Sequence, residues 1–310
     1  MDSRALQAVL DEALVASRDV CRRGHVASYI PELALVDPSL LGAACVDADG
    51  AFCFSGDAEV VFTFQSVSKL VSLAAALDLL GEERVFARVG MDPTADPFNS
   101  IMRLEMAKPH RPQNPLINAG ALVVLSLLPL EDADARFALV RQWARRLCGN
   151  DALDCHDPTY RSEKETADRN RSLAYFLRSV GAFSGDIENI LDSYFRQCSL
   201  WGNVRDLAVL GMTLASGGIN PLSKERVLPE RHAVILRALM ATCGLYDGSG
   251  DFAVHVGVPA KSGVGGGIAV AVPGKLGIGV FGPALDEKGN SAGGVALLEH
   301  FVRSVGLRVL

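Results

Sequence analysis

Short apolar runs of the kind that form β-strands occur near both ends of the chain, and a long helical block lies between them. Residues 40–57, LLGAACVDADGAFCFSGD, contain two such runs joined by a turn at Asp47–Gly50. The runs FAVHVGV, GGIAVAV and LGIGVFG follow near the other end and are bounded by glycine and proline. Strands from both ends can share one sheet if the helices between them form an inserted lobe. The pattern therefore predicts an α+β fold with an antiparallel sheet built from both chain ends.

The helical block extends from Gln65 to about Ser223. Helical periodicity is clear in DARFALVRQWARRL, RNRSLAYFLRSV and VRDLAVLGMTLASGG, and a last helix in SAGGVALLEHFVRSVG closes the chain. We therefore expect residues 1–64 and 225–310 to form a sheet lobe with flanking helices. Residues 65–224 are expected to form an all-helical lobe, with a functional site in the cleft between the two lobes.

The composition excludes several classes of protein. The 310 residues are 49% hydrophobic with a mean hydropathy of +0.22, which is enough to bury a sizeable core. The formal net charge is −6 and no basic stripe appears, so we expect neither a nucleic-acid nor a membrane partner. The most apolar tract, residues 256–285, is interrupted by Pro259, Pro273 and Pro283. Its pieces are too short to cross a bilayer as a helix and have the length of strands.

The cysteines and the N-terminal segment indicate a reducing compartment. The chain has seven cysteines without a C-x-x-C pair, and several lie in apolar contexts such as GAACV, which is typical of buried thiols. The segment MDSRALQAVLDEALVASRD has repeated acidic residues and lacks the continuous apolar stretch of a signal peptide. We therefore expect a cytoplasmic protein.

The segment FTFQSVSKLVSLAAALDLLG places Ser66 and Lys69 at the start of a predicted helix that stops at Gly81. Residues three apart share one face of a helix, so the hydroxyl and the amine can come close together. Serine becomes a good nucleophile when a base removes its proton, and burial beside the positive end of a helix favours a neutral lysine that can act as the base. The alternative is structural: Ser66 caps the helix and Lys69 is solvated.

A Lys-Ser-Gly triplet in PAKSGVGGGI, residues 259–268, is the second candidate motif. Such a triplet on a strand, late in a chain with an early S-x-x-K, is typical of serine acyl-transferring enzymes of the penicillin-recognising kind. A dinucleotide-binding loop is excluded because a strand, IAVAV, follows the glycines where that loop needs a helix. The alternative is a glycine-rich turn between two buried strands.

Polar residues of the helical block could bind a zwitterion. Glu163 and Asn170 in SEKETADRN are seven residues apart, so in one helix they share a face and could bind an ammonium and a carboxylate group. Asn118 precedes the apolar run of PQNPLINAGALVVL, where its amide could face a cleft. A solvated helix face and an N-cap are the alternatives. No metal site is predicted, because the six histidines are dispersed and no H-E-x-x-H occurs.

Several longer segments occur in a fixed order and spacing from about Tyr29 to the end of the chain. They are SYIPELA, FQSVSKL, NPLINAGALVV, SEKETADRNRSLAYFL, LDSYFRQCS, TCGLYDGSGDFAVHVGVPAKSGVGGGI and LDEKGNSAGG. Together they resemble the serine-dependent glutaminases, a bacterial and mitochondrial family related in fold to β-lactamases and transpeptidases. The resemblance implies a fold of that kind.

The resemblance also implies roles for individual residues. Ser66 resembles the nucleophile of the family and Lys69 its base, while Tyr246 resembles the hydroxyl nearest the serine, a candidate proton shuttle. Lys261 resembles the lysine of the triplet, a possible accessory residue. The backbone N–H of Val264 is implied to form an oxyanion hole with that of Ser66. The residues implied to line the site or hold the substrate are Tyr29, Gln65, Asn118, Glu163, Asn170, Tyr194, Tyr246 and Val264.

The function implied by the resemblance is hydrolysis of L-glutamine to L-glutamate and ammonia through a γ-glutamyl ester on Ser66, without a cofactor. A β-lactamase or peptidoglycan peptidase-like acyl hydrolase is the first alternative, and it would need export from the cytoplasm. A non-catalytic amino-acid-sensing domain of the same fold is the second. The resemblance further implies a homodimer or homotetramer. One departure from the family is Gly248 in YDGSG, where relatives often carry Phe or Ala.

Overall fold

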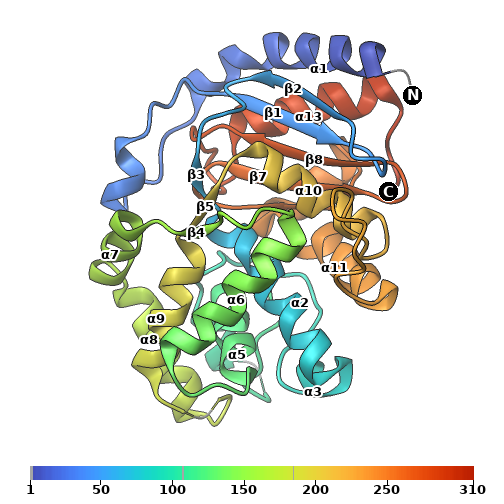
Figure 1. Cartoon of the computed structure of the whole chain (residues 1–310). Helices are drawn as coiled ribbons and strands as arrows, with labels where there is room; N and C mark the ends of the chain where they lie inside the picture. The colour runs from blue at the N-terminus through green and yellow to red at the C-terminus, as the bar shows by residue number, and fades with distance from the viewer. Residues whose placement is uncertain (1–2, 107, 184) are drawn as a thin grey trace.

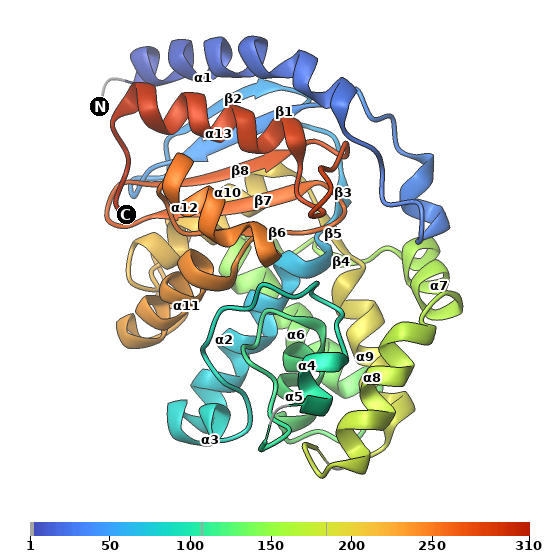
Figure 2. The ribbon, with the colours of Figure 1, turned by 180° about the vertical axis from the view of Figure 1, so that it is seen from behind.

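The computed structural model describes residues 3–106, 108–183 and 185–310 (Figures 1 and 2). Its helices are α1 (Ser3–Ser17), α2 (Lys69–Leu80), α3 (Glu82–Phe86), α4 (Met102–Met106), α5 (Asn118–Leu127), α6 (Ala133–Cys148), α7 (Asp157–Glu165), α8 (Asp168–Ser179), α9 (Ile187–Cys198), α10 (Val204–Ala215), α11 (Glu230–Cys243), α12 (Ser249–His255) and α13 (Ala292–Val305). Its strands are β1 (Gly42–Val46), β2 (Phe52–Gly56), β3 (Phe62–Thr63), β4 (Asp154–Cys155), β5 (Leu200–Gly202), β6 (Ala260–Ser262), β7 (Gly267–Val272) and β8 (Leu276–Phe281). Within these ranges, no helix combines the length and the apolar composition needed to cross a membrane.

The main sheet joins strands from both ends of the chain. Its order is β2-β1-β8-β7-β6, and all neighbouring strands are antiparallel. The two chain ends meet where β1 pairs with β8, with Gly42 opposite Phe281 and Val46 opposite Gly277. The predicted α+β fold, with an antiparallel sheet assembled from both termini, is confirmed.

Alternate side chains of the strands face two different layers. In β7, Val270 and its neighbours two residues away belong to the buried cluster that includes α1 and α13, whereas Ala269 and Ala271 belong to the cluster that includes α2 and α10. Figure 2 shows α1 and α13 side by side over one face of the sheet. The sheet is therefore buried on both faces, which explains why its strands are continuous apolar runs.

The backbone of helix α10 lies in direct contact with the backbone of the sheet. A Cβ added at Gly277 of β8 would lie 2.0 Å from the Ala208 carbonyl oxygen, and one at Gly279 would lie 2.0 Å from that of Val204. Only glycine allows such an approach, so these residues fix how closely α10 and β8 pack. Although α10 falls within the segment predicted for the helical lobe, it covers the sheet.

The segment predicted to be all-helical also carries two short strands. β5 pairs with β3 and β4, with Phe62 opposite Gly202 and Asp154 opposite Trp201. Strands of two or three residues are too short to produce an alternating pattern, so the sequence did not indicate them. This small sheet anchors β3, which leads directly into the turn that carries Ser66.

The prediction of a strand at residues 252–258 is wrong. Most of this run lies in α12. Phe252 and Val256 are buried and four residues apart, whereas Val254 between them is 72% exposed. This spacing matches one face of a helix and not the alternation of a strand. Short apolar runs are compatible with both elements, and the run FAVHVGV is such a case.

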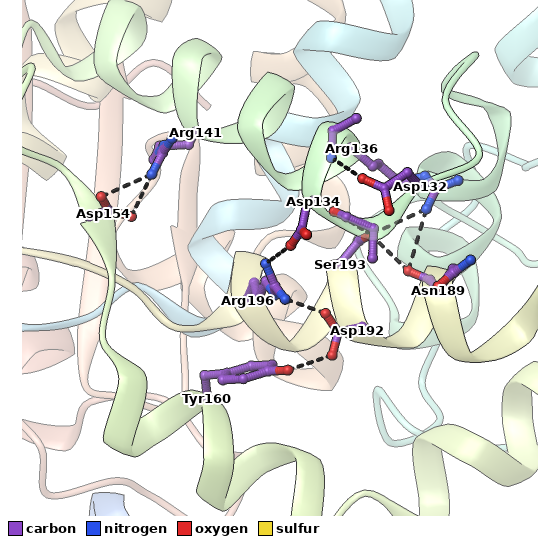
Figure 3. A network of polar contacts seen from close by, with 12 residues as sticks. Asp132, Asp134, Arg136, Arg141, Asp154, Tyr160, Asn189, Asp192, Ser193 and Arg196 are labelled. Atoms are coloured by element: carbon purple, nitrogen blue, oxygen red, sulfur yellow. Dashed lines mark hydrogen bonds and ion pairs between the residues drawn. The ribbon is translucent and has the colours of Figure 1, made fainter.

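Polar contacts tie α6, α7 and α9 together (Figure 3). The Asp192 carboxylate on α9 accepts a hydrogen bond from the Tyr160 hydroxyl on α7 at 2.5 Å and forms an ion pair with Arg196 Nε at 2.8 Å. Arg196 also contacts Asp134 on α6 at 2.5 Å. Because α7 and α9 each carry a candidate site residue, this network sets the positions of both.

Candidate functional site

The turn between β3 and α2 carries Ser66 and is strained. Gln65 has a φ of +48°, in the left-handed region that residues other than glycine rarely adopt. Gly263 packs so closely on this turn that a Cβ there would lie 2.4 Å from the Phe64 carbonyl oxygen and 3.2 Å from the Ser66 nitrogen. The surrounding structure therefore holds Ser66 in a fixed orientation against the glycine-rich segment that follows β6.

Lys69 is the first residue of α2 and is fully buried. Its Nζ donates hydrogen bonds to Asn118 Oδ1 at 2.7 Å and to the Leu116 carbonyl oxygen at 3.2 Å. Within the described part of the chain, Ser66 Oγ is not among its acceptors. Burial lowers the pKa of Lys69 to about 8, with the charge of Glu163 acting in the opposite direction. The alternative of a solvated Lys69 is wrong.

Tyr246 lies next to Ser66 and also has a strained backbone, with a φ of +56°. Its hydroxyl donates a hydrogen bond to the Ser262 carbonyl oxygen at 3.4 Å, and its ring packs on Phe98 with centroids 4.7 Å apart. Burial raises the pKa of Tyr246, while hydrogen bonds with Ser66 and Ser262 act in the opposite direction. The phenol therefore stays protonated at neutral pH beside the Ser66 hydroxyl.

Glu163, on α7, is a buried carboxylate beside a hydrogen-bond donor and a cation. Burial raises the pKa of Glu163 to about 7, against the opposing effects of a hydrogen bond from Gln65 and the charge of Lys69. A cationic ligand strongly stabilises the charged form of such a buried carboxylate, because the ligand replaces the solvation that burial removes.

The prediction that Glu163 and Asn170 share one helix is wrong. α7 ends at Glu165 and α8 begins at Asp168, so the two residues lie on separate helices. Asn170 Oδ1 accepts a hydrogen bond from Asn118 Nδ2 at 2.9 Å. Asn118 thus connects Lys69 to Asn170, and its side chain forms no cap on its own helix.

One cavity brings most of the predicted residues together. Tyr29 stands at the cavity with 56% of its surface exposed, whereas Tyr194 is buried. Lys69 and Tyr246 are not among the lining residues and lie behind its walls, next to residues that are. Within the described ranges, no group of three or more His, Cys, Asp or Glu residues could hold a metal ion. The predicted residues that line the cavity are Tyr29, Gln65, Ser66, Asn118, Glu163, Asn170, Tyr194 and Val264.

Two backbone N–H groups at this cavity, those of Ser66 and Val264, are available to a ligand. Within residues 3–106, 108–183 and 185–310, neither group donates a hydrogen bond to the protein. The close packing of Gly263 on the Ser66 turn brings the two peptide segments together. Unpaired donors beside a serine hydroxyl can stabilise negative charge on an oxygen atom bound there.

Further residues line the cavity that the sequence did not single out. Cys198 is one helical turn after Tyr194 on α9, so the spacing of four residues was a usable signal. Phe98 and Asn99 lie in an irregular segment and Arg169 precedes Asn170, where no pattern distinguishes them. The remaining lining residues are Ile30, Thr166 and Ala167.

Comparison with known proteins gives one consistent family. The Glutaminase family model matches residues 24–310. A glutaminase of Clostridium botulinum (strain Loch Maree / Type A3) is 48% identical over 307 residues, which cover 99% of each chain. Glutaminase 2 of Clostridium perfringens (strain 13 / Type A) is 44% identical over 300 residues, covering 97% of this chain and 98% of the relative.

Solved structures of the same kind match the fold, which is β-lactamase-like. A probable glutaminase has a TM-score of 0.96 at 39% identity, covering 100% of this chain and 99% of its own. A probable glutaminase from Bacillus subtilis complexed with 6-diazo-5-oxo-L-norleucine has a TM-score of 0.90 at 38% identity, covering 98% of this chain and 97% of its own. With the family model, the relatives and the fold in agreement, the chain belongs to the glutaminase family.

Proposed function

We propose that this glutaminase hydrolyses the side-chain amide of L-glutamine through a γ-glutamyl ester on Ser66. The observation that carries the proposal is a single cavity that joins Ser66 to a buried carboxylate, side-chain amides and unpaired backbone donors. These groups suit the two ends of glutamine, a zwitterionic head and a neutral amide. In support, a Bacillus subtilis glutaminase with a TM-score of 0.90 forms a covalent complex with 5-oxo-L-norleucine.

A second group of residues holds the α-ammonium and α-carboxylate groups of glutamine, which form the end of the substrate away from Ser66. Glu163 accepts a charge-assisted hydrogen bond from the α-ammonium group. Gln65 holds the Glu163 carboxylate in place. Asn118 and Asn170 contact the α-carboxylate, while Tyr29 and Tyr194 form the walls beside the side chain of the substrate.

The reaction proceeds in two steps. Neutral Lys69 serves as the base that activates Ser66, whose Oγ attacks the amide carbon. Lys69 takes up the proton of Ser66 while Tyr246 gives its own proton to the nitrogen, so that ammonia leaves and the γ-glutamyl ester remains. Water then attacks the ester and gives a proton to the Tyr246 oxygen, while Lys69 returns its proton to Ser66 Oγ, which releases L-glutamate.

The negative charge that develops on the carbonyl oxygen is stabilised by the N–H groups of Ser66 and Val264. One donor of this type contributes about 3 kcal/mol to lowering the barrier. The strained turn at Gln65 supports this role, since strained backbone of this kind clusters at active sites.

Release of ammonia from L-glutamine by the purified protein tests the proposal, and L-asparagine is the informative competitor. We expect kcat/KM for L-asparagine to be lower by about a hundredfold or more, because a shift of the carbonyl by about 1 Å has that effect. The head-group contacts and Ser66 lie on fixed elements, so a side chain one methylene shorter misplaces the reacting carbon. Comparable values for the two amides would contradict the proposed cavity, and absence of turnover would favour an amino-acid-sensing domain.

Replacing Glu163 with Gln is expected to weaken substrate binding while kcat changes little. Loss of a charge-assisted hydrogen bond costs about 1.5–3 kcal/mol, which raises KM for L-glutamine by roughly 10- to 100-fold. In the wild type, KM should also rise as the pH falls below about 7, because Glu163 is then protonated in the free enzyme. This pH dependence should be absent from the Glu163→Gln variant. Steady-state kinetics between pH 5.5 and 9 measure both effects, with that pH range chosen to span the pKa.

Two controls identify the group that Glu163 contacts. Glu165→Gln changes an exposed carboxylate on the same helix and should leave KM unaltered. Glutaramate, the glutamine analogue without the α-amino group, should react equally slowly with the wild type and with Glu163→Gln. If the substitution weakened the reaction of glutaramate as much as that of glutamine, Glu163 would not be the partner of the ammonium group.

The predicted homo-oligomer and the cytoplasmic location stay predictions that rest on the sequence. Sedimentation of the purified protein and fractionation of cells that express it would test them separately from the reaction.

A further inference from the structure

Cys45 on β1 and Cys53 on β2 lie directly opposite each other in the main sheet, and the proposed reaction uses neither of them. Both are buried and belong to the cluster that includes α1 and α13. Side chains at paired positions point to the same face of a sheet, so the two thiols are neighbours. In agreement, burial raises the pKa of Cys45, and the charge and hydrogen bond of the Cys53 thiol raise it further.

The hydrogen bonds of the hairpin determine how far apart the two cysteines are. Asp47 N donates to the Ala51 carbonyl oxygen at 3.2 Å. Hydrogen-bonded pairs recur at every second position of an antiparallel ladder, so Cys45 and Cys53 form the next such pair. Their Cα atoms are then about 5.5 Å apart, which a disulfide can bridge. The Cβ atoms of such a pair are farther apart than in a relaxed disulfide, so the bond would be strained and easily reduced.

A cavity of about 360 Å³ makes Cys53 accessible to small molecules. Its lining includes Cys53 and the exposed residues Ser3, Ala51 and Lys275, so the cavity reaches the surface. Cys45 is not among the described residues that line it, and β1 lies inside the sheet whereas β2 is an edge strand. A small oxidant therefore meets the Cys53 thiol first.

The Cys53 thiol also holds the start of α1 on the sheet. Its Sγ donates a hydrogen bond to the Ser3 carbonyl oxygen at 3.6 Å. One helical turn later, Gln7 Nε2 donates to the Phe54 carbonyl oxygen at 2.7 Å, and Gln7 Oε1 accepts from the Phe54 nitrogen at 3.2 Å. A disulfide has no S–H group. Oxidation of Cys53 therefore removes the contact with Ser3 and leaves those of Gln7.

We propose that Cys45 and Cys53 form a reversible disulfide when the protein meets a peroxide, and that this disulfide loosens the first turn of α1. The Cys53 sulfur attacks one oxygen of hydrogen peroxide and the O–O bond breaks. Cys53 becomes a sulfenic acid, and the other oxygen leaves as water with the thiol proton. The Cys45 sulfur then attacks the Cys53 sulfur, whose hydroxyl group leaves as water with the Cys45 proton. Two thiols thus lose two electrons while one peroxide is reduced to two water molecules.

The pair differs from the thiols of a fast redox sensor. Burial raises the pKa of Cys53, so little thiolate is present at neutral pH and the first step is slow. The strain of the product acts in the other direction, since it makes the disulfide easy to reverse. We therefore expect the bond to accumulate under sustained oxidation and to disappear when a thiol reductant returns.

Treatment of the full chain with hydrogen peroxide, followed by peptide mapping without a reductant, tests the inference. The wild type should yield a Cys45–Cys53 cross-linked peptide, and dithiothreitol should restore both thiols. Cys45→Ser should stop at the sulfenic acid of Cys53, which dimedone traps. Cys53→Ser should leave Cys45 reduced, because the oxidant does not reach it. Cys155→Ser changes the half-buried cysteine on β4 and should leave the cross-link unaffected.

Amide hydrogen exchange measures the effect on α1. In the oxidised wild type, exchange in the first turn of α1 should rise about 2- to 10-fold, the factor that one hydrogen bond contributes. Cys53→Ala should show the same rise without peroxide, whereas Cys45→Ser without peroxide should match the reduced wild type. Unchanged exchange in the oxidised protein would overturn the coupling to α1. A wild type without the cross-link, at a peroxide concentration that oxidises Cys155, would overturn the disulfide itself, and this result needs no variant to fold.

Discussion

Ser66→Ala is expected to abolish ammonia release from L-glutamine while the variant still binds L-glutamate. The substitution removes the atom that forms the ester but none of the groups that hold the head of the substrate. Loss of a serine nucleophile lowers kcat by roughly 10⁴-fold or more, since only binding and oxyanion stabilisation remain. Coupled detection of ammonia measures the turnover, and calorimetric titration with L-glutamate measures the binding.

Ser72→Ala is the matched control for Ser66→Ala. Ser72 is a buried serine on α2, and its Oγ donates a hydrogen bond to the Lys69 carbonyl oxygen at 3.3 Å. This variant should keep the turnover of the wild type. If Ser66→Ala retained more than about a tenth of the wild-type kcat, the reaction would not proceed through an ester on Ser66.

Lys69→Arg is expected to be nearly inactive between pH 6 and 10, although it conserves the positive charge. The proposed base must be neutral, and a guanidinium group with a pKa above about 12 does not become neutral in this range. A general base contributes about 10²- to 10⁴-fold to the rate, so the loss should have that size. In the wild type, raising the pH removes the proton from Lys69. The rate should therefore rise through a pKa of about 8 and level off above it.

A matched control variant accompanies Lys69→Arg, and one result would contradict the role of Lys69 as the base. Lys275→Arg makes the same chemical change at an exposed position in the turn between β7 and β8 and should leave the pH profile unaltered. Substantial turnover by Lys69→Arg would mean that Lys69 is a structural cation. Tyr246 would then be the base, and the pH profile of the wild type would have to be assigned to it.

The sequence predicted the fold well where the pattern was long. The strands β7 and β8 are continuous apolar runs bounded by glycine and proline, and α6 and α10 show clear helical periodicity. The sequence predicted a strand where α12 lies, because a run of seven mostly apolar residues is compatible with both the helical and the strand periodicity. β4 and β5 could not be predicted, because their pairing depends on contacts between residues far apart in the chain.

The candidate site was predicted as a set of residues, but its geometry was not. The motif resemblance named Ser66 and Glu163 without showing that α7 and α8 are separate helices, since the break at residues 166–167 contains neither glycine nor proline. The positive φ of Gln65 was equally hidden, because a glutamine gives no signal for a conformation that usually requires glycine. Strain of this kind is imposed by the packing of Gly263 and becomes visible only in three dimensions.

The pairing of β1 with β8 determines when the enzyme can first become active during its synthesis. β1 leaves the ribosome more than two hundred residues before β8, and at about 5–20 residues per second the interval is roughly 10–50 s. Throughout that time the β1–β2 hairpin has an open edge and little stability of its own. The nascent chain already contains Ser66, but Tyr246 and Val264 are translated 180 and 198 residues after it. A polypeptide released early, within the helical segment, is therefore an inert product that cannot deplete glutamine.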